Sequence, residues 1–178
     1  MNNESYPDID QRIDLRLRLK EFRCDALKVL NVGAGNPFVV RHGFLSQMRF
    51  INFKQLDHIE IYPSALDKVK GAEWAAQVVG FILGDIRDFD FSDYDLILMF
   101  DVIEHLYKED GLKVLGRVKH GLVFIPIEKE LMKANPKDPN PYQIHVSRWN
   151  EEELKGLGFG TEVLNNYHQT FGAMWGVK

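Results

Sequence analysis

Apolar and polar positions divide the chain into short apolar runs separated by longer segments of helix-forming composition. The apolar runs have the length of buried strands and fall at Val29–Val32, Leu56–Ile61, Val78–Leu83, Tyr94–Phe100 and Leu122–Ile125. The segments between them predict helices at Pro37–Met48, at Ser64–Trp74 and from just after Asp101 to about Val118. Strands that alternate with helices in this way predict a parallel sheet with helices on both faces.

The two ends of the chain depart from this alternation. Residues Asp8–Arg23 have apolar side chains at every second position but a composition rich in helix formers, and we expect a helix packed on the sheet. Near the other end, Asn150–Lys155 predicts a helix, and Thr161–Tyr167 and Phe171–Val177 predict two strands that pair antiparallel. The expected fold class is therefore α/β. It is a Rossmann-like, doubly wound, mostly parallel sheet of seven strands with a C-terminal antiparallel hairpin, in a single domain over residues 1–178.

One long segment, Glu128–Ser147, has no sustained period and contains Asn-Pro and Asp-Pro pairs, which favour turns. Loops of this length in compact domains are often functional, so we expect it to cover a site as a lid. Three aromatic residues are candidates to line a substrate pocket near it: Tyr62, Tyr142 and Trp149.

The first apolar run leads into a glycine turn, Gly33-Ala34-Gly35, followed by Asn36-Pro37. Asn and Pro are typical of a helix N-cap and of the first helical position. A strand that turns through glycines into a helix start presents backbone N–H groups to a polar ligand. Dinucleotide binding needs a third glycine where this chain has Phe38, and no Gly-Lys-Ser/Thr phosphate loop follows. The turn therefore indicates a ligand without a pyrophosphate.

Acidic residues follow three other strands, at the edge of a parallel sheet where ligands bind. Glu60 ends the second strand, where it can accept both hydroxyls of a ribose. Asp85 follows the third strand, where it can accept an exocyclic amine, and Asp101 follows the fourth. Together with the glycine turn, these residues describe an adenosine joined to a small zwitterionic group.

In order and spacing, these segments resemble the motifs of class I S-adenosylmethionine-dependent methyltransferases over nearly the whole chain. The four motifs correspond to Val29–Gly35, His58–Leu66, Gly84–Ile86 and Tyr94–Leu106. The resemblance implies S-adenosyl-L-methionine as cofactor. The residues it places at the cofactor are Asn31, Gly33, Ala34, Gly35, Glu60, Ile61, Asp85, Ile86 and Asp101. The family usually has an acid at position 31, and Asn31 keeps hydrogen bonding there without the negative charge.

Methyl transfer requires the nucleophile, the methyl group and the sulfur in line, and a hydroxyl acceptor also needs a base. His105, just past the fourth strand, is the first candidate base, and His145 in the long loop is the second. With Asp101 and Glu104, these histidines are also similar to the metal site of small-RNA 2′-O-methyltransferases. We assign no metal from the sequence, because Glu-His after this strand also occurs in metal-free members and Asp101 is shorter than their glutamate.

Composition narrows the remaining choices. The formal net charge of −4 argues against a general nucleic-acid surface, and the single cysteine, Cys24, excludes an intrachain disulfide and a cysteine metal cluster. No run has membrane-spanning length, and Met1–Gln11 is unlike a signal peptide, so we expect a soluble cytoplasmic protein.

The expected function is methyl transfer to an O or N atom of a small molecule, such as a sugar or another metabolite. One alternative is a non-catalytic S-adenosylmethionine-binding module of an assembly, which Asn31 supports. The other is a metal-assisted RNA 2′-O-methyltransferase. The acceptor and the oligomeric state stay open.

Overall fold

The computed structural model describes residues 14–33, 44–131, 140–165 and 172–178. Within them, one sheet has the strand order β3-β2-β1-β4-β5-β7-β6. The strands are β1 Lys28–Val32, β2 Gln55–Glu60, β3 Val78–Leu83, β4 Leu96–Phe100, β5 Gly121–Ile127, β6 Gly160–Leu164 and β7 Gly172–Val177. Strands β1 to β5 pair in parallel, and β7 pairs antiparallel with both β5 and β6. The doubly wound sheet and its C-terminal hairpin confirm the fold expected from the sequence.

Two of the helices expected between the strands are shorter or divided, and the helix expected over 37–48 is described only from Phe44 onward. The α-helices are α1 Leu15–Leu19, α2 Phe44–Met48, α3 Pro63–Lys70, α4 Lys108–Arg117 and α5 Glu151–Gly156. The 3₁₀ turns are η2 Lys20–Phe22, η3 Cys24–Ala26, η4 Glu73–Gln77, η5 Ile103–His105 and η6 Pro141–Gln143. The helix expected over Ser64–Trp74 ends its α-helical part at Lys70, where Gly71 forms the C-cap. The stretch after Asp101 divides into η5 and α4.

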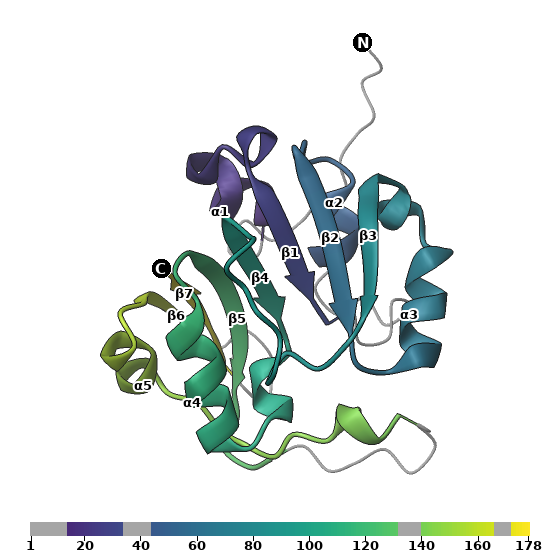
Figure 1. Cartoon of the computed structure of the whole chain (residues 1–178). Coiled ribbons are helices and arrows are strands. Elements are labelled where there is room, and N and C mark those ends of the chain that lie inside the picture. The colour runs from purple at the N-terminus through teal and green to yellow at the C-terminus, as the bar shows by residue number, and fades with distance from the viewer. Residues whose placement is uncertain (1–13, 34–43, 132–139, 166–171) are drawn as a thin grey trace.

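Helices lie on both sides of the sheet (Figure 1), and buried apolar side chains form one layer against each face. One layer joins buried side chains of α1, α2 and α3, such as Leu15, Met48 and Val69, to one face of the sheet. The other joins Val114 of α4 and Leu154 of α5 to the opposite face. Alternate strand residues therefore enter different layers, which fixes the register of each strand.

The N-terminal segment shows why an alternating pattern can belong to a helix. Leu15 and Leu19, four residues apart, are buried, whereas Leu17 between them is 54% exposed. Asp14 caps the helix by accepting a hydrogen bond from the Arg16 backbone N–H. Arg18 forms an ion pair with Glu162 of β6. Of the helix expected over 8–23, the structure confirms Leu15–Leu19, which a 3₁₀ turn extends to Phe22; residues 1–13 lie outside the described residues.

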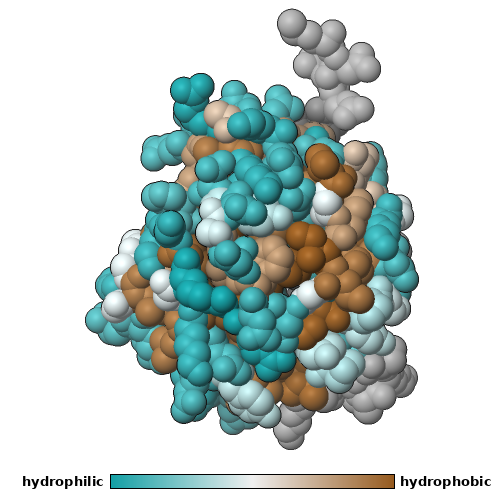
Figure 2. All heavy atoms as spheres, viewed as in Figure 1, coloured by the Kyte–Doolittle hydropathy of each residue, from teal (hydrophilic) through white to brown (hydrophobic). Residues whose placement is uncertain are grey.

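The connection from β3 to β4, residues 84–95, consists of turns without a helix. Figure 2 shows apolar surface gathered over the part of this face where Figure 1 places β2 and β3. Val79 and Leu83 of β3 are 71% and 56% exposed. The edge strand β3 therefore presents two aliphatic side chains to solvent.

Among the described helices, none combines the length and apolar character that a bilayer crossing requires.

Candidate functional site

The predicted cofactor residues gather at the carboxyl ends of neighbouring strands. β1 pairs in register with both β2 and β4, so Gly33, Glu60 and Asp101 lie along one edge of the sheet. The Gly33 backbone N–H donates to the Ile59 carbonyl over 2.9 Å, which holds the turn against β2. Asp85 follows β3, one strand further along the same edge.

Gly33 occupies a position that requires glycine. Its φ is +68°, in the left-handed region that side chains rarely adopt. A Cβ added there would lie 2.9 Å from the Cγ2 atom of Val102. The chain therefore turns tightly out of β1, as the glycine motif predicts. The rest of that motif, Ala34 and Gly35, lies outside the described residues.

Asn31 is fully buried and pairs with a histidine of the neighbouring strand. Its Nδ2 atom lies 2.9 Å from Nδ1 of His58 and 3.4 Å from the Gly33 carbonyl oxygen. Burial lowers the pKa of His58 to about 4, so its Nδ1 accepts the amide hydrogen as a neutral ring. Asn31 Oδ1 has no hydrogen-bond partner among the described residues. A neutral pair thus stands where the methyltransferase family usually has an acid.

Glu60 is 6% exposed at the end of β2, and its Oε1 accepts a hydrogen bond of 3.0 Å from the Tyr62 backbone N–H. Ile61 follows it and is half-buried. The Tyr62 and Tyr142 rings have their centroids 6.4 Å apart. Turn η6, in the long loop 128–147, therefore lies beside the strand end where ribose binding is expected.

Asp85 is already engaged. Arg87 contacts its carboxylate through both its backbone and its guanidinium, and this interaction lowers the pKa of Asp85. Ile86 between them is buried. The carboxylate expected to accept an exocyclic amine is therefore already hydrogen-bonded to Arg87.

Asp101 adopts an unusual backbone conformation. Its φ is +53°, which is uncommon for a residue with a side chain. Its N–H donates to the Phe124 carbonyl of β5 over 3.0 Å. This sharp turn ends β4 and leads directly into η5, which carries Glu104 and His105. Left-handed residues of this kind are enriched at active sites.

Three side chains meet beyond this turn. Glu104, His105 and His145 each offer a ligand atom, and these atoms all lie within 4.8 Å of one another. The two imidazole rings meet edge to face, with centroids 4.7 Å apart. Glu104 is 1% exposed, and neither of its carboxyl oxygens has a hydrogen-bond partner among the described residues. Burial, together with the nearby charge of Asp101, raises the pKa of Glu104 well above its usual value.

The partners of the two histidines assign their tautomers. His105 Nδ1 lies 3.2 Å from the Ile144 carbonyl oxygen, and His145 Nδ1 lies 2.9 Å from Glu128 Oε2. Because a carbonyl and a carboxylate only accept, we place a hydrogen on Nδ1 of each ring, which in a neutral imidazole leaves the lone pair on Nε2. Burial, with a smaller effect of His145, lowers the pKa of His105 to about 4, so this base is uncharged at neutral pH.

Glu128 is a site residue that sequence reasoning missed. It is the residue directly after β5, so its place at a strand end was the available signal. The prediction that Trp149 lines a pocket is wrong. Trp149 is 3% exposed, its Nε1–H donates to Ser147 Oγ over 2.9 Å, and Lys108 Nζ lies 3.7 Å from its ring centroid.

A cavity of about 390 Å³ lies near the amino ends of β4 and β5, lined by residues including Phe91, Ile97, Arg117 and His120. None of the predicted cofactor or catalytic residues lines it. The described residues among them lie instead near the carboxyl ends of the strands.

No model of a protein family matches the sequence, and no curated protein matches it. Solved structures do match. A SAM-dependent methyltransferase from Leishmania major has a TM-score of 0.64 and 15% identity, covering 94% of this chain and 71% of that one. The N-terminal domain of EvdMO1, crystallised in the presence of S-adenosylhomocysteine and D-fucose, has a TM-score of 0.59 and 16% identity, covering 94% and 82%.

The small RNA methyltransferase HEN1 is also similar, with a TM-score of 0.58 and 18% identity. The match covers 94% of this chain but 24% of HEN1. At these identities the likeness establishes the fold. The chain has the fold of class I S-adenosylmethionine-dependent methyltransferases.

Proposed function

We propose that this chain is an S-adenosylmethionine-dependent methyltransferase that methylates an oxygen or nitrogen atom of a small molecule. The observation that carries the proposal is the placement of Gly33, Glu60 and Asp85 along one carboxyl edge of a methyltransferase-like sheet. Similar structures include one crystallised in the presence of S-adenosylhomocysteine, which supports the same cofactor here.

The residues present fit this cofactor. Gly33 leaves backbone exposed where a Cβ would meet Val102, which suits close approach of an amino-acid tail. Asn31 Oδ1 is a buried acceptor without a partner among the described residues, which suits an ammonium or N–H donor. Glu60 supplies a buried carboxylate for ribose hydroxyls.

The bound cofactor supplies an electrophilic methyl group on a sulfonium. The chain's own part is to orient the acceptor, exclude water and remove a proton where the acceptor is a hydroxyl. His105 suits the last task because its Nδ1 is fixed by the Ile144 carbonyl and its Nε2 carries the lone pair. The described part of the loop 128–147 places His145 beside His105 and Tyr142 beside Tyr62. The net charge of −4 favours a small acceptor over a nucleic acid.

The test is calorimetric titration with S-adenosylhomocysteine. We expect micromolar binding, and a loss of more than about 1.5 kcal/mol in Glu60→Ala, because the ribose hydroxyls lose their acceptor. Asp67→Ala, an exposed carboxylate of α3, is the matched control and should bind as the wild type does. Absence of binding by the wild type would contradict the cofactor and leave a methyltransferase-like scaffold with another task.

A second candidate, metal-assisted methyl transfer, is favoured by the cluster of Glu104, His105 and His145. A carboxylate with two imidazole nitrogens is a donor set that suits divalent transition metals. The fit rests on Glu104, whose buried oxygens lack partners among the described residues and would gain one. These three residues would hold the ion, which would favour the deprotonated form of an acceptor hydroxyl.

Titration with Mn²⁺ separates the two candidates. If the cluster holds a metal, Mn²⁺ binds with one-to-one stoichiometry and Glu104→Gln weakens that binding at least about tenfold. Glu109→Gln, an exposed acid at the start of α4, is the control. No Mn²⁺ binding, with methyl transfer that resists a chelator, would favour His105 acting as a base without metal.

A further inference from the structure

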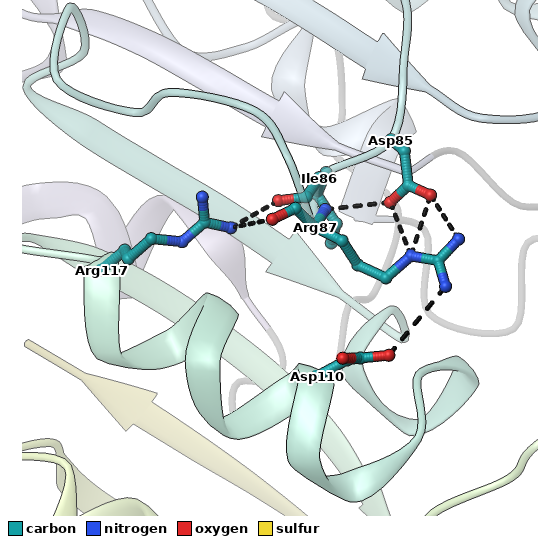
Figure 3. A network of polar contacts seen from close by, with 5 residues as sticks. All are labelled: Asp85, Ile86, Arg87, Asp110 and Arg117. Carbon is teal, nitrogen blue, oxygen red and sulfur yellow. Dashed lines mark hydrogen bonds and ion pairs between the residues drawn. The ribbon is translucent and has the colours of Figure 1, made fainter.

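The loop after β3 holds a carboxylate whose acceptor positions are already filled. Asp85 Oδ1 accepts from the Arg87 backbone N–H over 2.9 Å and from Arg87 Nε over 3.0 Å. Asp85 Oδ2 accepts from the same Nε over 2.8 Å and from Nη2. A carboxylate offers about four acceptor positions, so Arg87 alone fills Asp85 (Figure 3).

The Arg87 guanidinium lies between two carboxylates. On its other side, Nη1 is 3.9 Å from Oδ2 of Asp110, in the first turn of α4. Figure 3 shows the side chain reaching from Asp85 toward this helix. The Arg87 and Asp110 side chains are 44% and 33% exposed, so a shift of the guanidinium needs no rearrangement of buried groups.

The backbone of the same loop is held independently. Arg117, in the last turn of α4, donates to the carbonyls of Ile86, Arg87 and Phe89 over 2.7, 2.9 and 3.0 Å. This brace takes the place of a helix between β3 and β4. Arg87 can therefore change partner while the loop backbone, and with it Asp85, keeps its position.

We propose that Arg87 competes with the cofactor's adenine amine for Asp85, and that cofactor binding transfers the guanidinium from Asp85 to Asp110. The inference rests on the proposed function, because it needs an adenine at this edge. In this scheme Asp85 accepts the hydrogen bond of the amine. Arg87 competes for the same carboxylate and so lowers the affinity gained from that hydrogen bond. Asp110 pairs with the displaced guanidinium. Arg87 and Asp110 are positioning residues in this scheme.

The experiment measures the affinity for S-adenosylhomocysteine by calorimetry in Arg87→Ala, Asp110→Asn and the double variant. Exposed ion pairs of this kind contribute little, so the expected changes are about two- to fivefold. Arg87→Ala should bind more tightly and Asp110→Asn more weakly than the wild type. In the Arg87→Ala background, Asp110→Asn should have no further effect, because no displaced guanidinium remains to be received. Arg49→Ala, which loses an exposed ion pair with Glu73, is the control.

A second ligand checks that the competition concerns the amine. The analogue of S-adenosylhomocysteine whose base is unsubstituted purine has hydrogen in place of the adenine amine, so its base has no N–H to donate to Asp85. Arg87→Ala should therefore leave its affinity unchanged. A merely structural role of Arg87 would change the affinity for both ligands alike.

Weaker or unchanged binding of S-adenosylhomocysteine by Arg87→Ala would overturn the exchange. So would an equal effect of Asp110→Asn in both backgrounds. In either case, binding by the wild type leaves the proposed cofactor standing. If neither the wild type nor Arg87→Ala binds the ligand, the proposed function and the exchange fail together.

Discussion

Two clusters of titratable side chains lie near the carboxyl ends of the strands, and they differ in exposure and in hydrogen bonding. The Asp85–Arg87–Asp110 cluster is partly exposed, and a guanidinium lies between its two carboxylates. In the Glu104–His105–His145 cluster, Glu104 and His145 are buried and His105 is half-buried, and the Glu104 carboxyl has no hydrogen-bond partner among the described residues. The first cluster is satisfied and screened by solvent, so changes in it cost little. The second contains a buried carboxyl that would be stabilised by a proton or a cation, so substitutions in it should change stability strongly.

This difference indicates which of the two clusters lowers the stability of the fold. A buried polar group without a partner destabilises the fold, and it persists where the site uses it. Glu104 fits that description, while Asp85 is held by an ion pair that any surface tolerates. Variants that remove the unpaired carboxyl of Glu104, or the ion pair of Asp85 with Arg87, test this difference.

The largest effect is expected from Glu104→Met. An apolar side chain of similar volume removes the unpaired carboxyl, so in the presence of a chelator the free energy of unfolding should rise by about 1–3 kcal/mol. If the cluster holds a metal, methyl transfer without a chelator should fall by about 10²-fold, because the ion loses its carboxylate ligand. Denaturant unfolding and initial rates measure the two effects.

The pH dependence of this gain has a defined sign. The raised pKa of Glu104 means that the folded protein binds more protons than the unfolded chain above the ordinary value of 4.5. Wild-type stability therefore falls as pH rises from there through the folded pKa, and the advantage of Glu104→Met grows over the same range. An advantage that shrinks as pH rises would contradict the assignment of Glu104 as the unsatisfied group.

The next effect concerns the buried histidine of the Asn31 pair. With a folded pKa of about 4 against an ordinary 6.5, neutral His58 stabilises the fold fully above pH 6.5 and loses that contribution as pH falls toward 4. In this window His58→Gln should flatten the dependence of unfolding free energy on pH by about 1.4 kcal/mol per pH unit. His120→Gln, an exposed histidine, should leave the slope unchanged. Equal slopes in His58→Gln and the wild type would show that His58 is not held neutral.

A smaller effect is expected from the brace behind Asp85. Arg117→Met removes three charge-assisted hydrogen bonds to carbonyls at a partly exposed site, and the free energy of unfolding should fall by about 1–2 kcal/mol. Arg117→Lys should recover only part of it, because lysine lacks the planar fork. An unchanged free energy of unfolding in Arg117→Met would mean that the loop 84–95 keeps its conformation without these hydrogen bonds.

The smallest effect is expected from Arg87→Ala. Because the Arg87 side chain is 44% exposed, its ion pair with Asp85 should change the free energy of unfolding by less than about 0.5 kcal/mol. Thermal unfolding of Arg87→Ala beside Arg117→Met measures the contrast. A loss as large as that of Arg117→Met would make Arg87 a structural brace rather than a side chain that changes partner.

The sequence predicted the fold because its strands are continuous apolar runs that end in glycines and acids. β3 appears in the structure as Val78–Leu83, the range that its apolar run predicts. The secondary structure of the first segment was ambiguous in the sequence, because the alternating leucines of 14–19 have a strand period. Only the packing shows that Leu17 points outward. Helix ends were overestimated where Gly71 caps α3 early.

The site was predictable as far as it follows strand ends. Glu60, Asp85 and Asp101 were found this way, and their roles as cofactor residues stay predictions. What the sequence lacks is pairing between distant segments. It does not show that Glu128 holds His145, that Arg87 fills Asp85, or that Trp149 is buried beneath Lys108. These contacts depend on side-chain directions that no period encodes.

The most direct test of the account is the map of backbone amide shifts on adding S-adenosylhomocysteine to ¹⁵N-labelled protein. We expect shifts at the carboxyl ends of the strands, at Gly33, Ile61 and Ile86, with little change at Lys28 and Gly121 at the amino ends. Shifts confined to the amino ends, or none at saturating ligand, would contradict the placement of the cofactor and the proposed activity with it.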